Sequence, residues 1–95
     1  MANIQLTTVT TGTVTAMDTQ QDLTVIHDAG ATVTLSVTFP STPINGQSFN
    51  LCSVGGITTL TLTTVVGTIS NILTTMSAGG TATWKFYSTK WYKIG

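Results

Sequence analysis

The chain has 95 residues, a formal net charge of zero and only 6 % charged residues, whereas soluble domains average about 25 %. This length predicts one domain, residues 1–95, and the 41 % hydrophobic content argues against a disordered chain. No apolar run is long enough to span a membrane, and the N-terminus lacks the pattern of a secretory signal. Met1 leads us to expect a complete gene product, and the single cysteine, Cys52, fits synthesis in a reducing cytosol.

Short strand-like segments begin at the N-terminus. Residues 4–9 and 12–17 have weak strand patterns, and residues 23–28 form a strand that a turn at 28–30 separates from the next one. Residues 31–39 have the clearest pattern, because apolar residues alternate strictly with Thr and Ser. This alternation is typical of a strand with one buried face.

The middle of the chain continues in the same way. Residues 40–47 are expected to form a loop, because they contain two prolines and an Asn-Gly pair. Residues 48–54 form a strand, and after a tight turn at Gly55-Gly56 we expect residues 57–64 to pair back onto it.

The C-terminal part ends in an aromatic, basic hairpin. Residues 67–70 interrupt the strand pattern, and residues 71–77 form either a short strand or an irregular segment. Residues 81–88 form a strand that a turn at 88–90 joins to the last one. In total, about seven to nine short strands predict an all-β fold, a small antiparallel β-sandwich or barrel of jelly-roll type.

The alternation also predicts the core. We expect Thr32, Thr34 and Thr38 to be more exposed than their apolar neighbours. The residues expected to be buried are Val33, Leu35, Val37, Phe39, Leu60, Leu62, Trp84 and Phe86.

Few residues are candidates for chemistry. Asp18, Asp22 and Asp28 lie near predicted turns, where Asp commonly bonds the backbone, so we prefer that role to a catalytic carboxylate pair. His27 is in phase with core residues and is interpreted as structural, and Cys52 as a small buried hydrophobe. We therefore expect no enzymatic activity, no metal site and no cofactor.

The terminal hairpin is the candidate interaction surface. Its aromatic and basic residues could stack on a sugar or bind nucleic acid, but three lysines on a neutral chain make a weak electrostatic surface, so we expect no nucleic-acid partner. The alternative is that Trp84 and Phe86 belong to the core while Trp91 or Tyr92 covers its edge. The candidate surface consists of Lys85, Tyr87, Lys90, Trp91, Tyr92 and Lys93.

Two further patterns concern threonine and charge. Thr-x-Thr sequences recur and suggest an ice-binding surface, but their spacing is irregular and no solenoid period is apparent, so we interpret them as solvated strand faces. All three Asp lie in residues 18–28 and all three Lys in residues 85–93. We expect at least one lysine to approach an aspartate of the 18–28 segment, in the same or a neighbouring chain.

Residues 31–95 resemble the small β-domains of bacteriophage virion proteins. The similarity rests on Phe39-Pro40 with Pro43, on Asn45-Gly46-Gln47, and on the ending Trp91-Tyr92-Lys93-Ile94-Gly95. Such domains occur as fibre tips, head fibres and capsid decoration proteins, commonly as trimers.

The resemblance implies a non-enzymatic structural protein on the virion surface. We expect it to decorate or cement the capsid as a homo-oligomer, a trimer, in contact with the major capsid protein or another virion protein. The alternative is host-surface adhesion, in which the terminal aromatic residues contact a glycan. Near-zero net charge also favours association.

Overall fold

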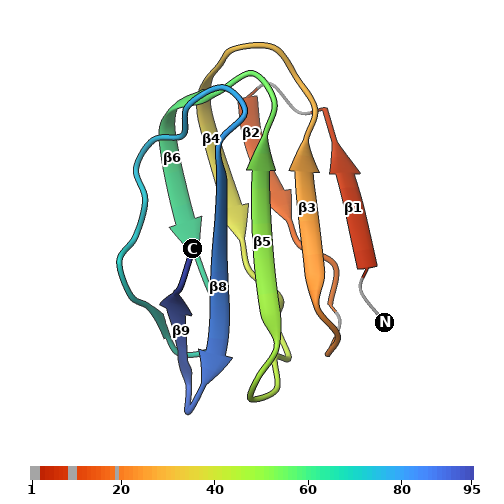
Figure 1. The fold of residues 1–95 in the computed structure, drawn as a ribbon, viewed down its shortest axis with the longest axis vertical. Helices are drawn as coiled ribbons and strands as arrows, with labels where there is room; N and C mark the ends of the chain where they lie inside the picture. Colours follow the sequence, from red (N-terminus) through yellow and green to blue (C-terminus); the bar gives the residue numbers. More distant parts are fainter. Residues whose placement is uncertain (1–2, 9–10, 19) are drawn as a thin grey trace.

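A computed structural model describes residues 3–8, 11–18 and 20–95 and shows an all-β chain with no helix among these residues. The strands form one six-stranded sheet, in the order β1-β3-β5-β8-β9-β7, and one three-stranded sheet, in the order β2-β4-β6 (Figure 1). The nine strands of the described residues are β1 (Asn3–Thr7), β2 (Thr11–Thr15), β3 (Leu23–His27), β4 (Thr32–Thr38), β5 (Ser48–Ser53), β6 (Ile57–Thr63), β7 (Thr68–Ile69), β8 (Thr81–Tyr87) and β9 (Lys90–Lys93).

The first six strands form a β-solenoid. The chain alternates between the sheets, so that β1, β3 and β5 lie in the large sheet and β2, β4 and β6 in the small one. Each coil consists of one strand from each sheet, and successive coils pair in parallel. Figure 1 shows β1, β3, β5 and β8 side by side, with β2, β4 and β6 as a second layer.

The all-β class and the number of strands were predicted correctly, but the antiparallel sandwich or barrel was wrong. The turns at residues 28–30 and 55–56 do not close hairpins, because each carries the chain from the large sheet to the small one. Alternation shows which face of a strand is buried, but it does not show which strand lies beside it. Antiparallel pairing does occur at the C-terminal end, where β8 pairs with β5 and with β9.

The strands expected at residues 4–9, 12–17, 23–28, 31–39, 48–54, 57–64 and 81–88 all correspond to observed strands, with small shifts at their ends. Val9, the last residue of the first expected strand, lies outside the described residues, as does Met1. The hairpin turn at residues 88–90 is confirmed. The short strand β7 lies where an interruption was expected, and residues 71–77 are irregular, with Met76 bridging to Ile57.

The corners of successive coils are stacked on one another by backbone hydrogen bonds. The Val54 amide donates to the His27 carbonyl at 3.1 Å, and the Thr32 amide donates to the Gly56 carbonyl at 3.1 Å. Gly55 is required at this stack, because a Cβ there would lie 2.4 Å from the carbonyl oxygen of Ala29. The coils can therefore approach to the hydrogen-bonding distance only with glycine at this corner.

The core lies between the two sheets and is aromatic at its C-terminal side. Phe39 contacts Phe49, Trp84 and Trp91, with ring centroids 4.4, 5.2 and 5.3 Å apart. The predicted core residues Leu35, Val37, Phe39, Leu60, Leu62, Trp84 and Phe86 are all buried.

The predictions for Val33 and Thr32 were wrong. Val33 is 70 % exposed, whereas Thr32 is buried. The alternation breaks just after the corner, since both Val33 and Thr34 are exposed before Leu35 turns inward. The Thr32 hydroxyl donates to the Gly30 carbonyl at 3.1 Å and lies 3.5 Å from Nε2 of His27, so Thr32 and the buried His27 fill the corner together.

The pair Leu35 and Val33 tests the assigned inner face. We expect Leu35→Ala to lower the free energy of unfolding by about 2–5 kcal/mol, because it leaves a cavity between the sheets. Val33→Ala, the control, should change it by less than about 0.5 kcal/mol, because Val33 is solvent-exposed. Urea denaturation measures both, and similar losses in the two variants would contradict the assignment.

Two glycines test the stacked corners. Gly55→Ala should destabilise the fold by about 0.5–3 kcal/mol, because the new methyl group meets the backbone of the neighbouring corner. Gly30→Ala is the matched control, since a Cβ at Gly30 meets no atom within 4 Å. Thermal unfolding should give a lower melting temperature for Gly55→Ala than for Gly30→Ala. An equal loss of stability in the two variants would refute the close approach of Gly55 to the backbone of residues 29–30.

Candidate functional site

Four of the six predicted surface residues gather on the outer face of β8 and β9. In the antiparallel register Lys85 lies opposite Tyr92, and Tyr87 lies opposite Lys90, so lysines and tyrosines alternate in a small square. Tyr87 is 62 % and Tyr92 43 % exposed, and Nζ of Lys90 lies 5.7 Å from the centroid of the Tyr92 ring. We call this group, Lys85, Tyr87, Lys90 and Tyr92, the lysine–tyrosine face.

The other two predicted residues lie elsewhere. Trp91 is fully buried, with its ring 5.1 Å from Phe86 and 5.3 Å from Phe39, so its assignment to the interaction surface was wrong. Lys93 lies at the level of Trp84 and lines a separate hollow with Leu73. Adjacent residues of a strand point to opposite faces, which separates Trp91 and Lys93 from Tyr92.

Lys85 is held at the border between β8 and β5. Its ammonium group donates to the Gly46 carbonyl at 3.2 Å and to Oγ of Ser48 at 3.0 Å. The Ser48 amide in turn donates to Oδ1 of Asp22 at 2.9 Å. Lys85 and Asp22 thus bond the same residue from two sides, while the expected approach of a lysine to an aspartate in an assembled oligomer stays a prediction.

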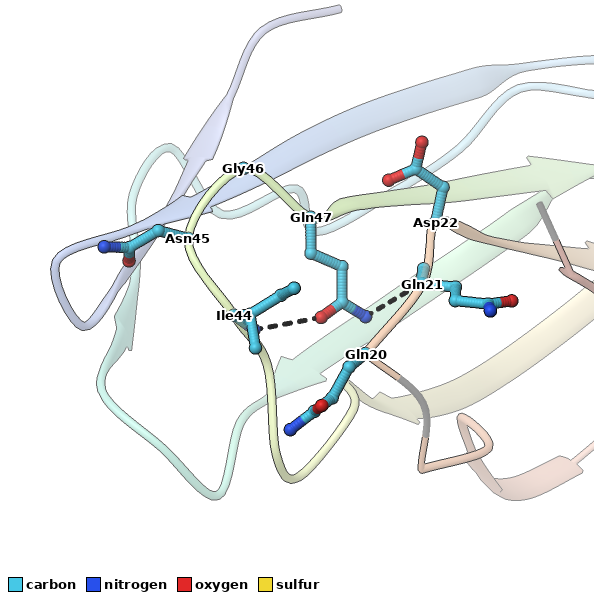
Figure 2. A pocket seen from close by; sticks show the side chains of 7 residues that line it. All are labelled: Gln20, Gln21, Asp22, Ile44, Asn45, Gly46 and Gln47. Atoms are coloured by element: carbon cyan, nitrogen blue, oxygen red, sulfur yellow. Dashed lines mark hydrogen bonds between the residues drawn. The ribbon is translucent and has the colours of Figure 1, made fainter. Parts of the chain in front are cut away.

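A shallow hollow of about 290 Å³ lies beside this border, between residues 20–22 and 44–47 (Figure 2). Gln47, only 3 % exposed, points across it. Its Oε1 accepts from the Ile44 amide at 3.1 Å and its Nε2 donates to the Gln21 carbonyl at 2.9 Å. The side-chain amide of Gln47 therefore connects the loop at residues 44–47 to residue 21 of the preceding coil, so its role is structural.

The neighbouring residues of the Asn-Gly-Gln motif are also structural. The Oδ1 of Asn45 accepts from the Ser88 amide at 3.0 Å, and the Gly46 amide donates to the Phe86 carbonyl at 2.7 Å. Gly46 has a φ of 90°, which favours glycine. Asn45 and Gly46 thus attach this loop to the β8–β9 hairpin.

His27 is buried as expected, and of the three aspartates Asp22 bonds a backbone amide, the role expected for all three. Asp18 accepts from the Thr42 hydroxyl, and Asp22 from the Ser48 amide. His27 is fully buried beside Thr32, and Asp28 is exposed at the corner. Among the described residues, no three His, Cys, Asp or Glu side chains gather closely enough to hold a metal ion.

The outer face of β1, β3 and β5 carries an apolar patch that sequence reasoning did not single out. Leu6, Ile26 and Cys52 lie side by side in the register of the three strands, with Ile4 two residues before Leu6. Ile4 and Leu6 are 68 % and 63 % exposed. Cys52 is half-buried on this outer face, which corrects its interpretation as a core residue. We call these four residues the apolar patch.

The outer face of the small sheet carries hydroxyl groups in register. Each of β2, β4 and β6 contributes every second residue, and parallel pairing aligns them across the three strands. The resulting ranks are Thr11–Thr34–Thr59, Thr13–Ser36–Thr61 and Thr15–Thr38–Thr63. We call these nine residues the hydroxyl face.

The expectation that irregular spacing prevents such ranks was wrong. The coils differ in length, but the corners and loops absorb the difference, so the strands themselves are aligned. No repeat of fixed length is needed for a regular surface when the insertions lie outside the strands. Sequence inspection could have found the face only by aligning the Thr-x-Thr pattern of β2 and β6 with Thr34, Ser36 and Thr38.

No protein-family model, curated protein or solved structure matches this chain. In the parts of the chain that the structure describes, no helix has the length and apolarity needed to cross a bilayer.

Proposed function

We propose that this chain is a structural protein that assembles with copies of itself on the surface of a bacteriophage particle, where it decorates or cements the capsid. The observation that carries the proposal is the apolar patch on the outer face of the large sheet. Ile4 and Leu6 lie more than half exposed there, next to Ile26 and Cys52. A second copy of the chain is the occupant that we assign to this patch.

The energetics of association support a second copy. Full burial of one exposed Ile or Leu side chain contributes about 1.5–3 kcal/mol, so a patch that two or three copies share supplies several such contributions. The chain has zero formal net charge and therefore no long-range self-repulsion to oppose association. A trimer, as in the phage domains that the chain resembles, would bring three patches together.

The virion part of the proposal is supported by the resemblance described above. The residues that carry the resemblance have structural roles in this fold. Phe39 lies at the centre of the core, and the loop at Asn45–Gln47 is attached to the β8–β9 hairpin. The partners proposed on the particle are the major capsid protein or another virion protein. The chain would be made in the host cytoplasm and reside on the virion surface.

Self-association is tested by replacing Ile4 and Leu6 with Thr, a β-branched residue that suits a strand and removes apolar surface. We expect the wild-type chain to be oligomeric at micromolar concentration by light scattering, and the double variant to shift toward monomer. Val33→Thr combined with Val65→Thr is the control, because both valines are 70 % exposed but lie outside the patch. A monomeric wild type, or an unchanged double variant, would contradict the proposal.

The virion location has a separate readout. Mass spectrometry of gradient-purified particles from the phage that encodes the chain should find it together with the major capsid protein. If particles lack the chain while the purified protein still oligomerises, the virion assignment fails and self-association stands.

The lysine–tyrosine face favours a second candidate function, adhesion to a host glycan. Two exposed tyrosines at diagonal positions provide flat surfaces for stacking on sugar rings, and the two lysines provide hydrogen-bond donors. Tyr87→Ala combined with Tyr92→Ala should abolish binding on a glycan array, whereas Tyr87→Phe with Tyr92→Phe should retain the stacking part. If the wild type binds no glycan on the array, this candidate is rejected.

A further inference from the structure

The hydroxyl face forms a two-dimensional net with two regular spacings. Neighbouring strands of a sheet lie about 4.7–4.9 Å apart, and residues on one face of a strand follow each other at roughly twice the rise of 3.3 Å. The register of β2, β4 and β6 places a hydroxyl-bearing residue at each of the nine crossing points. Oxygen atoms in hexagonal ice also form planar nets, and their two repeats are of the same order as these two spacings.

Two hydroxyl groups of the net bond each other directly. Oγ1 of Thr38 and Oγ1 of Thr63, neighbours in one rank, lie 3.0 Å apart, an ordinary hydrogen-bond separation between two oxygens. A hydroxyl group has one donor and two acceptor lone pairs, so both groups keep hydrogen-bonding capacity for an ordered water layer beyond this bond. The inward neighbours Leu35, Val37 and Leu60 are buried, which anchors the strands beneath the face.

The face is also free of charge. The strands β2, β4 and β6 contain no Asp or Lys, and the six charged residues of the chain all lie outside them. Charged groups would orient their own hydration shells and disturb a water lattice. Threonine instead presents one hydroxyl and one methyl group on a side chain that is stiff at χ1, so the net is preorganised and loses little entropy on binding.

We propose that the hydroxyl face binds the surface of ice crystals through an ordered layer of water. The combination that carries this inference is the in-register net of hydroxyl and methyl groups, its two spacings and its lack of charge. The outer face of the large sheet has no such net, because Ile26, Asn50, Cys52 and Lys85 interrupt it. The site is independent of the apolar patch, which lies on the other sheet.

Partition into ice tests the proposal. A slowly grown ice hemisphere should enrich the wild-type protein relative to the liquid, and the protein should slow ice recrystallisation. Thr61→Tyr, which places a bulky ring on the net, should abolish the enrichment. Thr68→Tyr, an equally bulky change at an exposed position of β7 in the large sheet, should leave it unchanged.

Two conservative variants test whether ice binding depends on the arrangement of hydroxyl and methyl groups or only on the polarity of the face. Ser36→Thr completes the central rank with the methyl group that serine lacks, and it should increase enrichment in ice. Thr61→Val keeps the shape and removes one hydroxyl, and it should give an intermediate value. Circular dichroism spectra and melting curves of all variants show whether each one is folded.

The outcomes are decisive in both directions. A folded wild type that ice excludes, or a folded Thr61→Tyr variant that still partitions into ice, overturns the proposal. If Thr61→Tyr instead abolishes binding to crystalline chitin or cellulose while ice excludes the wild type, the face binds a polysaccharide and the ice assignment is wrong. The Ile4→Thr/Leu6→Thr variant should retain ice partition, so this proposal and self-association can fail separately.

Discussion

Parallel stacking of successive coils is the constraint on which the rest of this structure depends. Backbone bonds at the ends of the strands keep each coil at the level of the one before it, from Asp28 to Thr7 between the first two coils, and from Val54 to His27 and Thr32 to Gly56 between the second and third. The same register aligns apolar residues inward, where they form the core, and hydroxyl-bearing residues outward on the small sheet. A shift of one residue in any strand would exchange the two sets, so core packing and surface pattern are coupled.

The parts of the fold that depend on local sequence pattern could be predicted from the sequence. Strand positions and the inward placement of Leu35, Val37 and Leu60 follow from alternation alone, because side-chain direction in a strand depends only on position along it. Strand pairing did not follow, because a glycine turn at residues 55–56 looks the same whether it closes a hairpin or turns a corner. Val33 and Thr32 were misplaced for the same reason, since the corner shifts the alternation.

The candidate surfaces also differ in whether local sequence pattern or strand pairing determines them. Sequence reasoning placed four residues on one face of the hairpin, as the structure does: Lys85, Tyr87, Lys90 and Tyr92. In a hairpin, every second residue of each strand lies on the same face. Trp91 was misassigned because its aromatic character alone does not show which face of β9 its side chain points to. The hydroxyl face and the apolar patch depend on strands from different coils, so neither could be recognised before the parallel register was known.

The position of Trp91 in the core affects the order in which the chain can fold. Its ring contacts Phe39, Phe49 and Phe86, yet it lies in β9, which follows the other eight described strands in the chain. Until β9 docks, Phe39 and Phe49 lack one of their aromatic neighbours and are less protected from water. The aromatic core is therefore completed only when the β8–β9 hairpin has formed, and a chain in which β9 has not docked exposes apolar surface that can lead to misassembly.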